Sequence, residues 1–118
     1  MASATIDRPL PEAAAALGPK LTALRRAIHL EPELGLHNPK TSAKVRAALA
    51  HLPLSWREGA STTGMVATLD TGRPGRSVLL RGDMDALPMP EETGLAFAST
   101  VQGAMHACGH DADRKSVV

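Results

Sequence analysis

The first candidate site in the sequence is a pair of carboxylates in the segment RGDMDALP, where Asp83 and Asp85 follow the most apolar stretch of the chain. Side chains two residues apart on an extended segment point to the same face. These two carboxylates would repel each other unless a cation lay between them or one were protonated. A divalent metal ion would meet that need. The alternative is that both aspartates cap or solvate a turn, and the spacing alone leaves both interpretations open.

The second candidate site is the segment MHACGHD, which places two imidazoles, a thiol and a carboxylate within six residues. Thiolate and imidazole both suit zinc, manganese and similar first-row ions, and Asp111 could orient a ligand histidine. Gly109 would let the backbone bend so that Cys108 and His110 converge on one ion. The structural alternative is a buried cysteine flanked by hydrogen-bonded histidines, one of them His106. A nucleophilic role for Cys108 has less support, because no base or orienting partner is identified.

The other side chains with chemical potential are interpreted as structural. Three histidines fall at helix ends or in a loop, where we expect surface or capping groups: His29, His37 and His51. The adjacent Glu91 and Glu92 are predicted to form a solvated turn rather than a general-base pair. Arg25 and Arg26 are predicted to lie on a solvated helix face.

Two helices are predicted to precede the candidate sites. Leucines at helical spacing predict a helix over residues 19–30, with Pro19 in its first turn and Pro32 beyond its end. A second helix is predicted over residues 41–51, where Thr41 or Ser42 could cap the start.

Short strands are predicted after the helices. Residues 55–58 and 64–70 show strand patterns, and the apolar run Val78–Leu80 is typical of a buried strand. Residues 87–105 have loop character, with Phe97 as a lone apolar anchor. Helices followed by strands, with polar residues where a strand ends, indicate an α/β or α+β architecture.

Composition excludes several classes of protein. Of the 118 residues, 43% are hydrophobic and 21% charged, as in globular domains. Thirteen basic and twelve acidic residues give a net charge of +1, which does not suggest binding to nucleic acid or to an anionic membrane. There is no apolar run near the roughly 18 residues of a membrane span. The single cysteine and the lack of an export signal predict a cytoplasmic protein.

With one Trp, one Phe and no Tyr, the core is expected to be thin, as in a piece of a larger domain.

Three segments, in order, resemble the N-terminal part of the M20 metallopeptidase-like amidohydrolases. They are LRRAIHLEPELGL (24–36), SVLLRGDMDALPMPEETGLAFAST (77–100) and GAMHACGHDA (103–112). The branch they resemble contains hippurate hydrolases, N-acyl-amino-acid amidohydrolases and auxin-conjugate hydrolases. The resemblance implies a two-domain α/β enzyme with helices packed on a mixed sheet, a dinuclear metal site, and a smaller lid or dimerisation domain inserted later.

The resemblance also implies roles for individual residues. Cys108 and His110 match the first two metal ligands of this branch, and Asp85 matches a carboxylate that supports the ligand shell. Asp83 lies where related branches carry a ligand histidine, so its role stays open. Two divalent ions (Mn, Zn, Co or Ni) would polarise the amide carbonyl of a small N-acyl amino acid. Water would attack that carbonyl, and a glutamate expected beyond residue 118 would act as the base.

The expected organisation is a loose lead-in over residues 1–16 and a partial catalytic domain over residues 17–112. Residues 113–118, DRKSVV, depart from the family pattern and resemble a translated sequencing adapter. The chain by itself is expected to be inactive, and the resemblance allows a homodimer for the full-length form. Two other readings stay open: a naturally short, non-catalytic metal-binding module, and an M20 aminopeptidase or carboxypeptidase.

Overall fold

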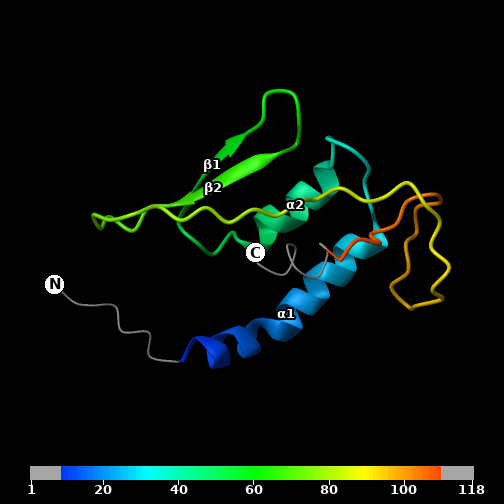
Figure 1. Ribbon diagram of the computed structural model, residues 1–118, viewed down its shortest axis with the longest axis horizontal. Coiled ribbons are helices and arrows are strands. Elements are labelled where there is room, and N and C mark those ends of the chain that lie inside the picture. The colour runs from blue at the N-terminus through cyan, green and yellow to red at the C-terminus, as the bar shows by residue number, and fades with distance from the viewer. Residues whose placement is uncertain (1–8, 110–118) are drawn as a thin grey trace.

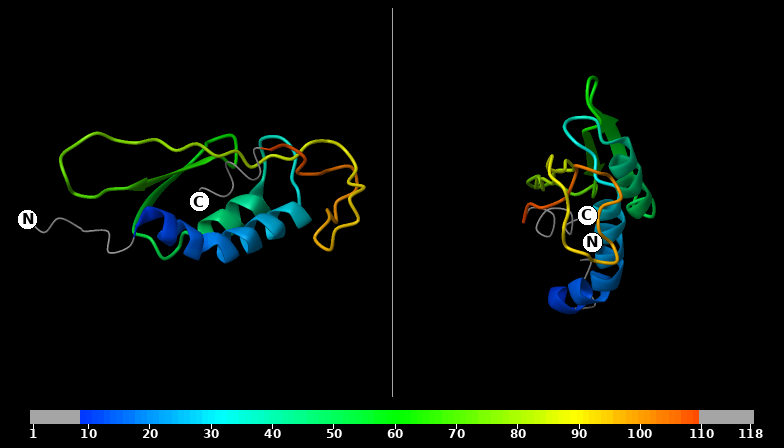
Figure 2. Two further views of the ribbon diagram at one scale, coloured as in Figure 1. Left: turned by 60° about the horizontal axis from the view of Figure 1, so that its bottom comes forward. Right: turned by 90° about the vertical axis from the view of Figure 1, so that its right-hand side faces the viewer.

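The fold, seen in a computed structural model that describes residues 9–109, consists of two helices followed by a β-hairpin and a long irregular segment. Helix α1 spans Leu10–Leu30 and α2 spans Pro39–Ala48, and strands β1 (Leu54–Glu58) and β2 (Met65–Leu69) form an antiparallel sheet. Figure 1 shows α1 and α2 side by side, with the hairpin beside α2. In Figure 2 the helices form one layer, and the hairpin and the segment that follows it lie over them.

Helix α1 begins at Leu10, well before the predicted start at Pro19, so the expected lead-in is helical from residue 10 onward. Pro9 is the N-cap and Pro11 lies in the first turn, where the missing N–H of proline costs no hydrogen bond. The alanine-rich stretch that follows has high helix propensity. Pro19 is accommodated inside the helix rather than at its start.

Helix α2 begins at Pro39 and ends at Ala48, and it is capped by neither residue predicted from the sequence. The carboxylate of Glu33 accepts hydrogen bonds from the N–H groups of Lys40 and Thr41 at 3.1 and 2.8 Å, and from the Thr41 hydroxyl at 2.8 Å. Glu33 therefore supplies the anionic cap from the preceding loop, where it also opposes the positive end of the helix dipole. Thr41 is fully buried beneath it.

The two strands predicted after the helices are confirmed. They pair antiparallel with Leu54 opposite Leu69 and Glu58 opposite Met65. Arg46 of α2 ties the hairpin to the helix layer, since its guanidinium pairs with the Glu58 carboxylate and lies 5.0 Å from the centre of the Trp56 ring.

The predicted buried strand at Val78–Leu80 is wrong for this chain. Val78, Leu79 and Leu80 are 85%, 86% and 71% exposed, and no strand is formed there. A strand that is apolar on both faces needs a hydrogen-bonded neighbour and cover on each face. Within residues 9–109 the only sheet is β1–β2, and the two isolated bridges there involve Ala86 and Leu87 rather than Val78–Leu80. The described part of the chain therefore provides neither, and the mixed sheet implied by the resemblance is not formed there.

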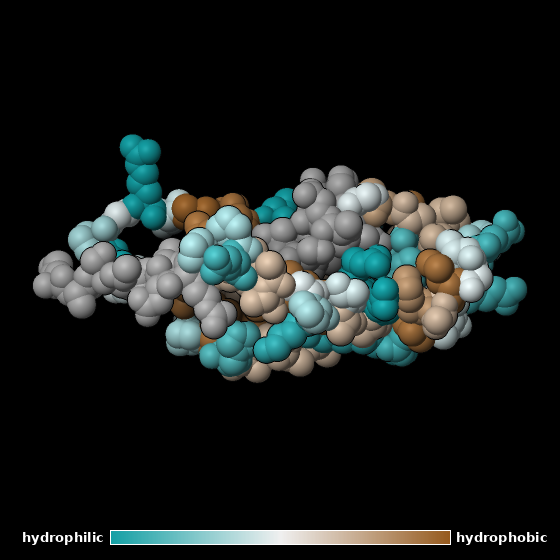
Figure 3. Space-filling view, turned by 90° about the horizontal axis from the view of Figure 1, so that it is seen from below, coloured by the Kyte–Doolittle hydropathy of each residue, from teal (hydrophilic) through white to brown (hydrophobic). Residues whose placement is uncertain are grey.

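The core of the described part is small, as the composition predicts. Its buried hydrophobic residues are Ile28, Ala86 and Ala104. Figure 3 shows apolar side chains reaching the surface in several places. None of the helices in this part of the chain is long and apolar enough to cross a membrane.

Candidate metal centre

Main-chain hydrogen bonds near the C-terminal end of α1 hold the two predicted site segments. Ala86 forms a parallel bridge with Leu34, and its N–H donates to the Glu33 carbonyl at 2.8 Å. Leu87 and Met105 form an antiparallel bridge in which each N–H donates to the other's carbonyl, at 2.9 and 3.0 Å. These bonds bring the residues just before Ala86 close to those just after Met105.

A cavity of about 130 Å³ lies where the two segments meet. Its lining comprises two carboxylates, an imidazole, a thiol and three apolar residues: Asp83, Asp85, Ala86, Leu87, His106, Ala107 and Cys108. His106 is buried and Asp83 is half-buried, whereas Asp85 and Cys108 are exposed. The structure thus brings together the carboxylate pair and the His–Cys segment, which lie about twenty residues apart in the sequence.

The donors around this cavity fit a divalent metal ion in type. Thiolate and imidazole are ligands for zinc and related ions, and carboxylate oxygens can complete or support such a set. Within residues 9–109, no three or more His, Cys, Asp or Glu side chains are arranged to hold a metal ion. The predicted ligand His110 and its neighbour Asp111 lie outside the described residues. The described part therefore offers suitable donors without a complete ligand set.

A second cavity, of about 290 Å³, lies between α2 and the hairpin. Its polar lining consists of hydroxyl groups and one ion pair: Ser42, Thr62, Thr63, Arg46 and Glu58. It contains no thiol or imidazole, so its chemistry differs from that of the first cavity.

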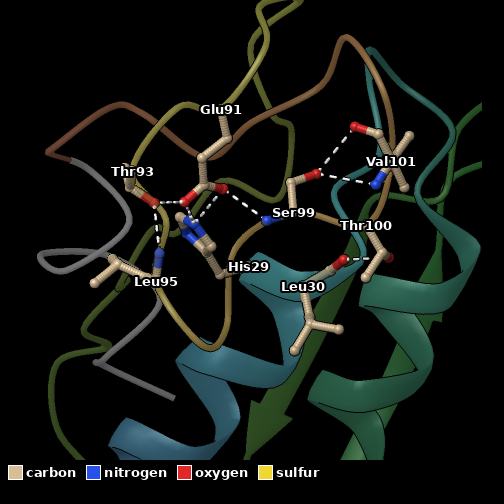
Figure 4. Close-up of polar contacts among 8 residues, drawn as sticks. All are labelled: His29, Leu30, Glu91, Thr93, Leu95, Ser99, Thr100 and Val101. Carbon is tan, nitrogen blue, oxygen red and sulfur yellow. Dashed lines mark hydrogen bonds and ion pairs between the residues drawn. The ribbon is translucent and has the colours of Figure 1, made fainter.

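A buried carboxylate–imidazole pair joins helix α1 to the loop that separates the two site segments. The Glu91 side chain is 2% exposed, and its two oxygens lie 3.1 and 2.9 Å from Nε2 of His29. The same carboxylate accepts hydrogen bonds from the Thr93 hydroxyl at 2.5 Å and the Ser99 N–H at 2.7 Å. Figure 4 shows these groups converging on Glu91. The predicted solvated turn at Glu91 and the predicted surface position of His29 are therefore wrong.

This environment changes the acidity of Glu91. Burial raises its pKa, but hydrogen bonds from Thr93, Ser99 and His29, together with the positive charge available on His29, outweigh burial and bring the pKa to about 2. Glu91 is therefore ionised at any neutral pH. By contrast, Glu92 is exposed, as predicted, and so are His37 and His51.

The predicted solvated arginines also have partners. Arg25 and Arg26 lie with their guanidinium carbons 5.7 and 4.5 Å from the centre of the Phe97 ring, which makes an edge contact with His29. Phe97 thus anchors its loop as the sequence predicts, and it does so on the arginine face of α1. Cation–π contacts of this kind stabilise by about 0.5–1 kcal/mol at exposed sites.

The sequence does not predict the roles of Glu33, Glu91 and His29. Each role depends on a hydrogen-bond partner that the pattern of neighbouring residues does not reveal. His29 and Glu91 are 62 residues apart in the chain. One signal could have indicated the pair: both residues fall inside the segments that carry the family resemblance, His29 in LRRAIHLEPELGL and Glu91 in PEETGL.

Comparison with known proteins agrees with that resemblance. The sequence pattern of peptidase family M20/M25/M40 matches residues 79–118. Thermostable carboxypeptidase 1 of Saccharolobus solfataricus is 46% identical over 89 residues, which cover 75% of this chain and 23% of that protein. N-acetyldiaminopimelate deacetylase of Streptococcus uberis is 43% identical over 99 residues, covering 77% of this chain and 25% of the deacetylase.

A solved structure shares the fold. The crystal structure of a Bacillus subtilis protein described as a dinuclear metal-binding peptidase of the M20 family matches with a TM-score of 0.76 and 36% identity. The match covers 86% of this chain and 28% of that one, and the chain spans about a quarter of the length of its curated relatives. The predicted motifs, the shared fold and these relatives agree that the chain is similar to about a quarter of the length of M20 family hydrolases and peptidases.

Proposed function

We propose that this chain contributes part of a dinuclear metal centre that hydrolyses the amide bond of N-acyl amino acids. The observation that supports this most directly is the cavity lined by Asp83, Asp85, His106 and Cys108. Two segments that are separate in the sequence place carboxylate, imidazole and thiol donors around one space. The dinuclear site described for the B. subtilis structure is the precedent for two ions.

In this proposal Cys108 and His110 are metal ligands and Asp85 supports the ligand shell. Cys108 is exposed on the cavity wall, where its thiol can lose a proton on binding an ion. Asp85 lies on the same cavity and could accept a hydrogen bond from a ligand imidazole, which fixes the ring's orientation. Bound divalent ions would polarise the scissile carbonyl.

The names of two relatives support a substrate class. The S. uberis relative is named for removing an acetyl group from an N-acyl amino acid, which supports a small N-acyl amino acid as substrate. A carboxypeptidase activity is the second candidate, because the 46% identical relative from S. solfataricus is named for that reaction. Both reactions hydrolyse an amide bond, so they make the same demand on the metal centre and differ in what binds beside it.

A chimeric enzyme tests this proposal. Residues 20–112 of this chain would replace the matching segment of the B. subtilis M20 peptidase, and hydrolysis of N-acetyl amino acids and of dipeptides would be measured with added Mn²⁺ or Zn²⁺. We expect an active chimera and a loss of about 100-fold or more on Cys108→Ala. Glu92→Gln, which removes an exposed carboxylate, is the matched control and should leave activity unchanged. An active chimera that Cys108→Ala leaves unaffected would contradict the assignment.

A further inference from the structure

The buried Glu91 carboxylate has no part in the chemistry proposed above, and it does not line the metal cavity. Its three hydrogen-bond donors come from both ends of one loop and from α1: Thr93, Ser99 and His29. Figure 4 shows the loop wrapped around this one side chain. Burying such a charge costs free energy unless its hydrogen-bond partners are in place, so the folded chain must hold these donors around it.

The directions of these hydrogen bonds require a carboxylate. The Leu95 N–H donates to the Thr93 oxygen at 3.4 Å, so the Thr93 hydroxyl is left to donate to Glu91. Ser99 contributes a main-chain N–H, which can only donate. An ionised carboxylate is an acceptor at both oxygens, whereas an amide would turn one of its ends into a donor facing donors.

The loop held by Glu91 is also tied to the last residues of α1. The N–H and hydroxyl of Thr100 both donate to the Leu30 carbonyl, at 2.9 and 2.7 Å. From there the chain runs directly to the metal segment: the Ala104 N–H donates to the Val101 carbonyl at 3.3 Å, and Ala104 is 2% exposed. The next residue, Met105, forms the reciprocal bridge with Leu87.

We propose that the Glu91–His29 pair is a positioning element for the metal centre. By holding the loop of residues 91–101 on the end of α1, it fixes where Met105 meets Leu87. That register determines whether Cys108 faces the cavity shared with Asp83 and Asp85. The proposal rests on the proposed function for the role of Cys108, but the positioning itself is a property of the loop and can be measured without metal.

Two measurements on the 118-residue chain test this proposal, with Glu91→Gln compared against Glu92→Gln. The first is hydrogen exchange at the amides of Leu87 and Met105, which reports the bridge directly. The second is titration with Co²⁺, read from the thiolate-to-cobalt absorption that only Cys108 can produce, since the chain has one cysteine. Thr93→Val, which removes a single donor, replaces Glu91→Gln if the latter fails to fold, as judged by helical circular dichroism.

We expect Glu91→Gln to accelerate exchange at both amides and to weaken Co²⁺ binding by roughly tenfold, as loss of a supporting partner does at metal sites. Thr93→Val should have smaller effects in the same direction, and Glu92→Gln none. A folded Glu91→Gln chain with unchanged bridge exchange, or with unchanged Co²⁺ affinity, would overturn the positioning role and leave only a stabilising one. If the unsubstituted chain gives no thiolate absorption, the proposed function fails. In that case faster bridge exchange would still support positioning of this segment, and unchanged exchange would overturn it.

Discussion

Two parts of this chain differ in whether the described residues satisfy their long-range contacts. Around Glu91, the loop of residues 91–101 and the end of α1 satisfy each other: a buried charge has three donors, and a helix carbonyl has two. In the stretch Val78–Leu80, three large apolar side chains are 71–86% exposed and form no ladder. In Figure 1 the first lies at the C-terminal end of α1, and the second lies on the long extended segment that follows β2.

The difference shows which long-range contacts these residues make among themselves and which they do not make. Polar contacts around Glu91 join residues 62 positions apart, and both partners are inside the chain. The apolar run has the composition of a strand covered on both faces, and the described residues supply no cover. The hydrogen bonds that hold the segment around Met105 are thus made within the described residues. The described residues supply neither a strand neighbour nor cover for Val78–Leu80.

The largest expected effect on stability comes from disrupting the hydrogen bonds of Glu91. Glu91→Gln should lower the free energy of unfolding by about 3 kcal/mol, because it removes the charge from a buried, multiply hydrogen-bonded pair. Glu92→Gln, one residue along the same loop and exposed, should change it by less than about 0.5 kcal/mol. Urea unfolding followed by circular dichroism measures both. Equal losses for the two variants would mean that the Glu91 network stabilises no more than a surface residue does.

Acid should weaken the same region in a defined pH range. The pKa of Glu91 is about 2 in the folded chain, against an ordinary value of 4.5. Because the folded-state pKa is depressed, the stabilisation is complete above pH 4.5 and is lost as the pH falls toward 2. Urea unfolding at a series of pH values should show this decline, and Glu91→Gln should flatten it. An unchanged slope in that variant would assign the acid sensitivity to other groups.

The smallest effect on stability is expected in the exposed stretch. Leu79→Lys should change the free energy of unfolding by less than about 0.5 kcal/mol, whereas Ile28→Ala, at a residue that is 1% exposed, should cost about 3 kcal/mol. The same lysine should reduce any self-association of the chain, since a charge discourages edge-to-edge pairing between exposed apolar segments. Sedimentation velocity measures the association. A Leu79→Lys chain as destabilised as Ile28→Ala would show that the stretch is packed.

The elements that the sequence predicts well are those determined by neighbours along the chain. Two short strand patterns predict strands at residues 55–58 and 64–70, and both strands of the hairpin lie where they are expected. The start of α1 was missed because Pro9, Pro11 and Pro19 indicate a break by their type. Proline is compatible with a helix in its first turn, and Pro19 shows that an interior position can also be accommodated.

The sequence predicts which residues line the candidate site better than it predicts the contacts that hold them in place. Asp83, Asp85, His106 and Cys108 stand out by residue type, and the structure gathers them around one cavity. The role of Glu33 depends on a contact with Thr41, eight residues away, and the role of Glu91 depends on a contact with His29, 62 residues away. A surface-like carboxylate and a buried one look identical in sequence, because burial is decided by what folds over them.

The most direct test of the central claim is whether Cys108 binds metal. The chain would be titrated with Co²⁺ alongside Cys108→Ala, with Glu92→Gln as the control, and the thiolate-to-cobalt absorption recorded. We predict saturable absorption in the unsubstituted chain and in Glu92→Gln, and none in Cys108→Ala. Co²⁺ binding of equal affinity in Cys108→Ala, or no thiolate absorption in any of the three chains, would contradict the assignment of this cavity as a metal centre.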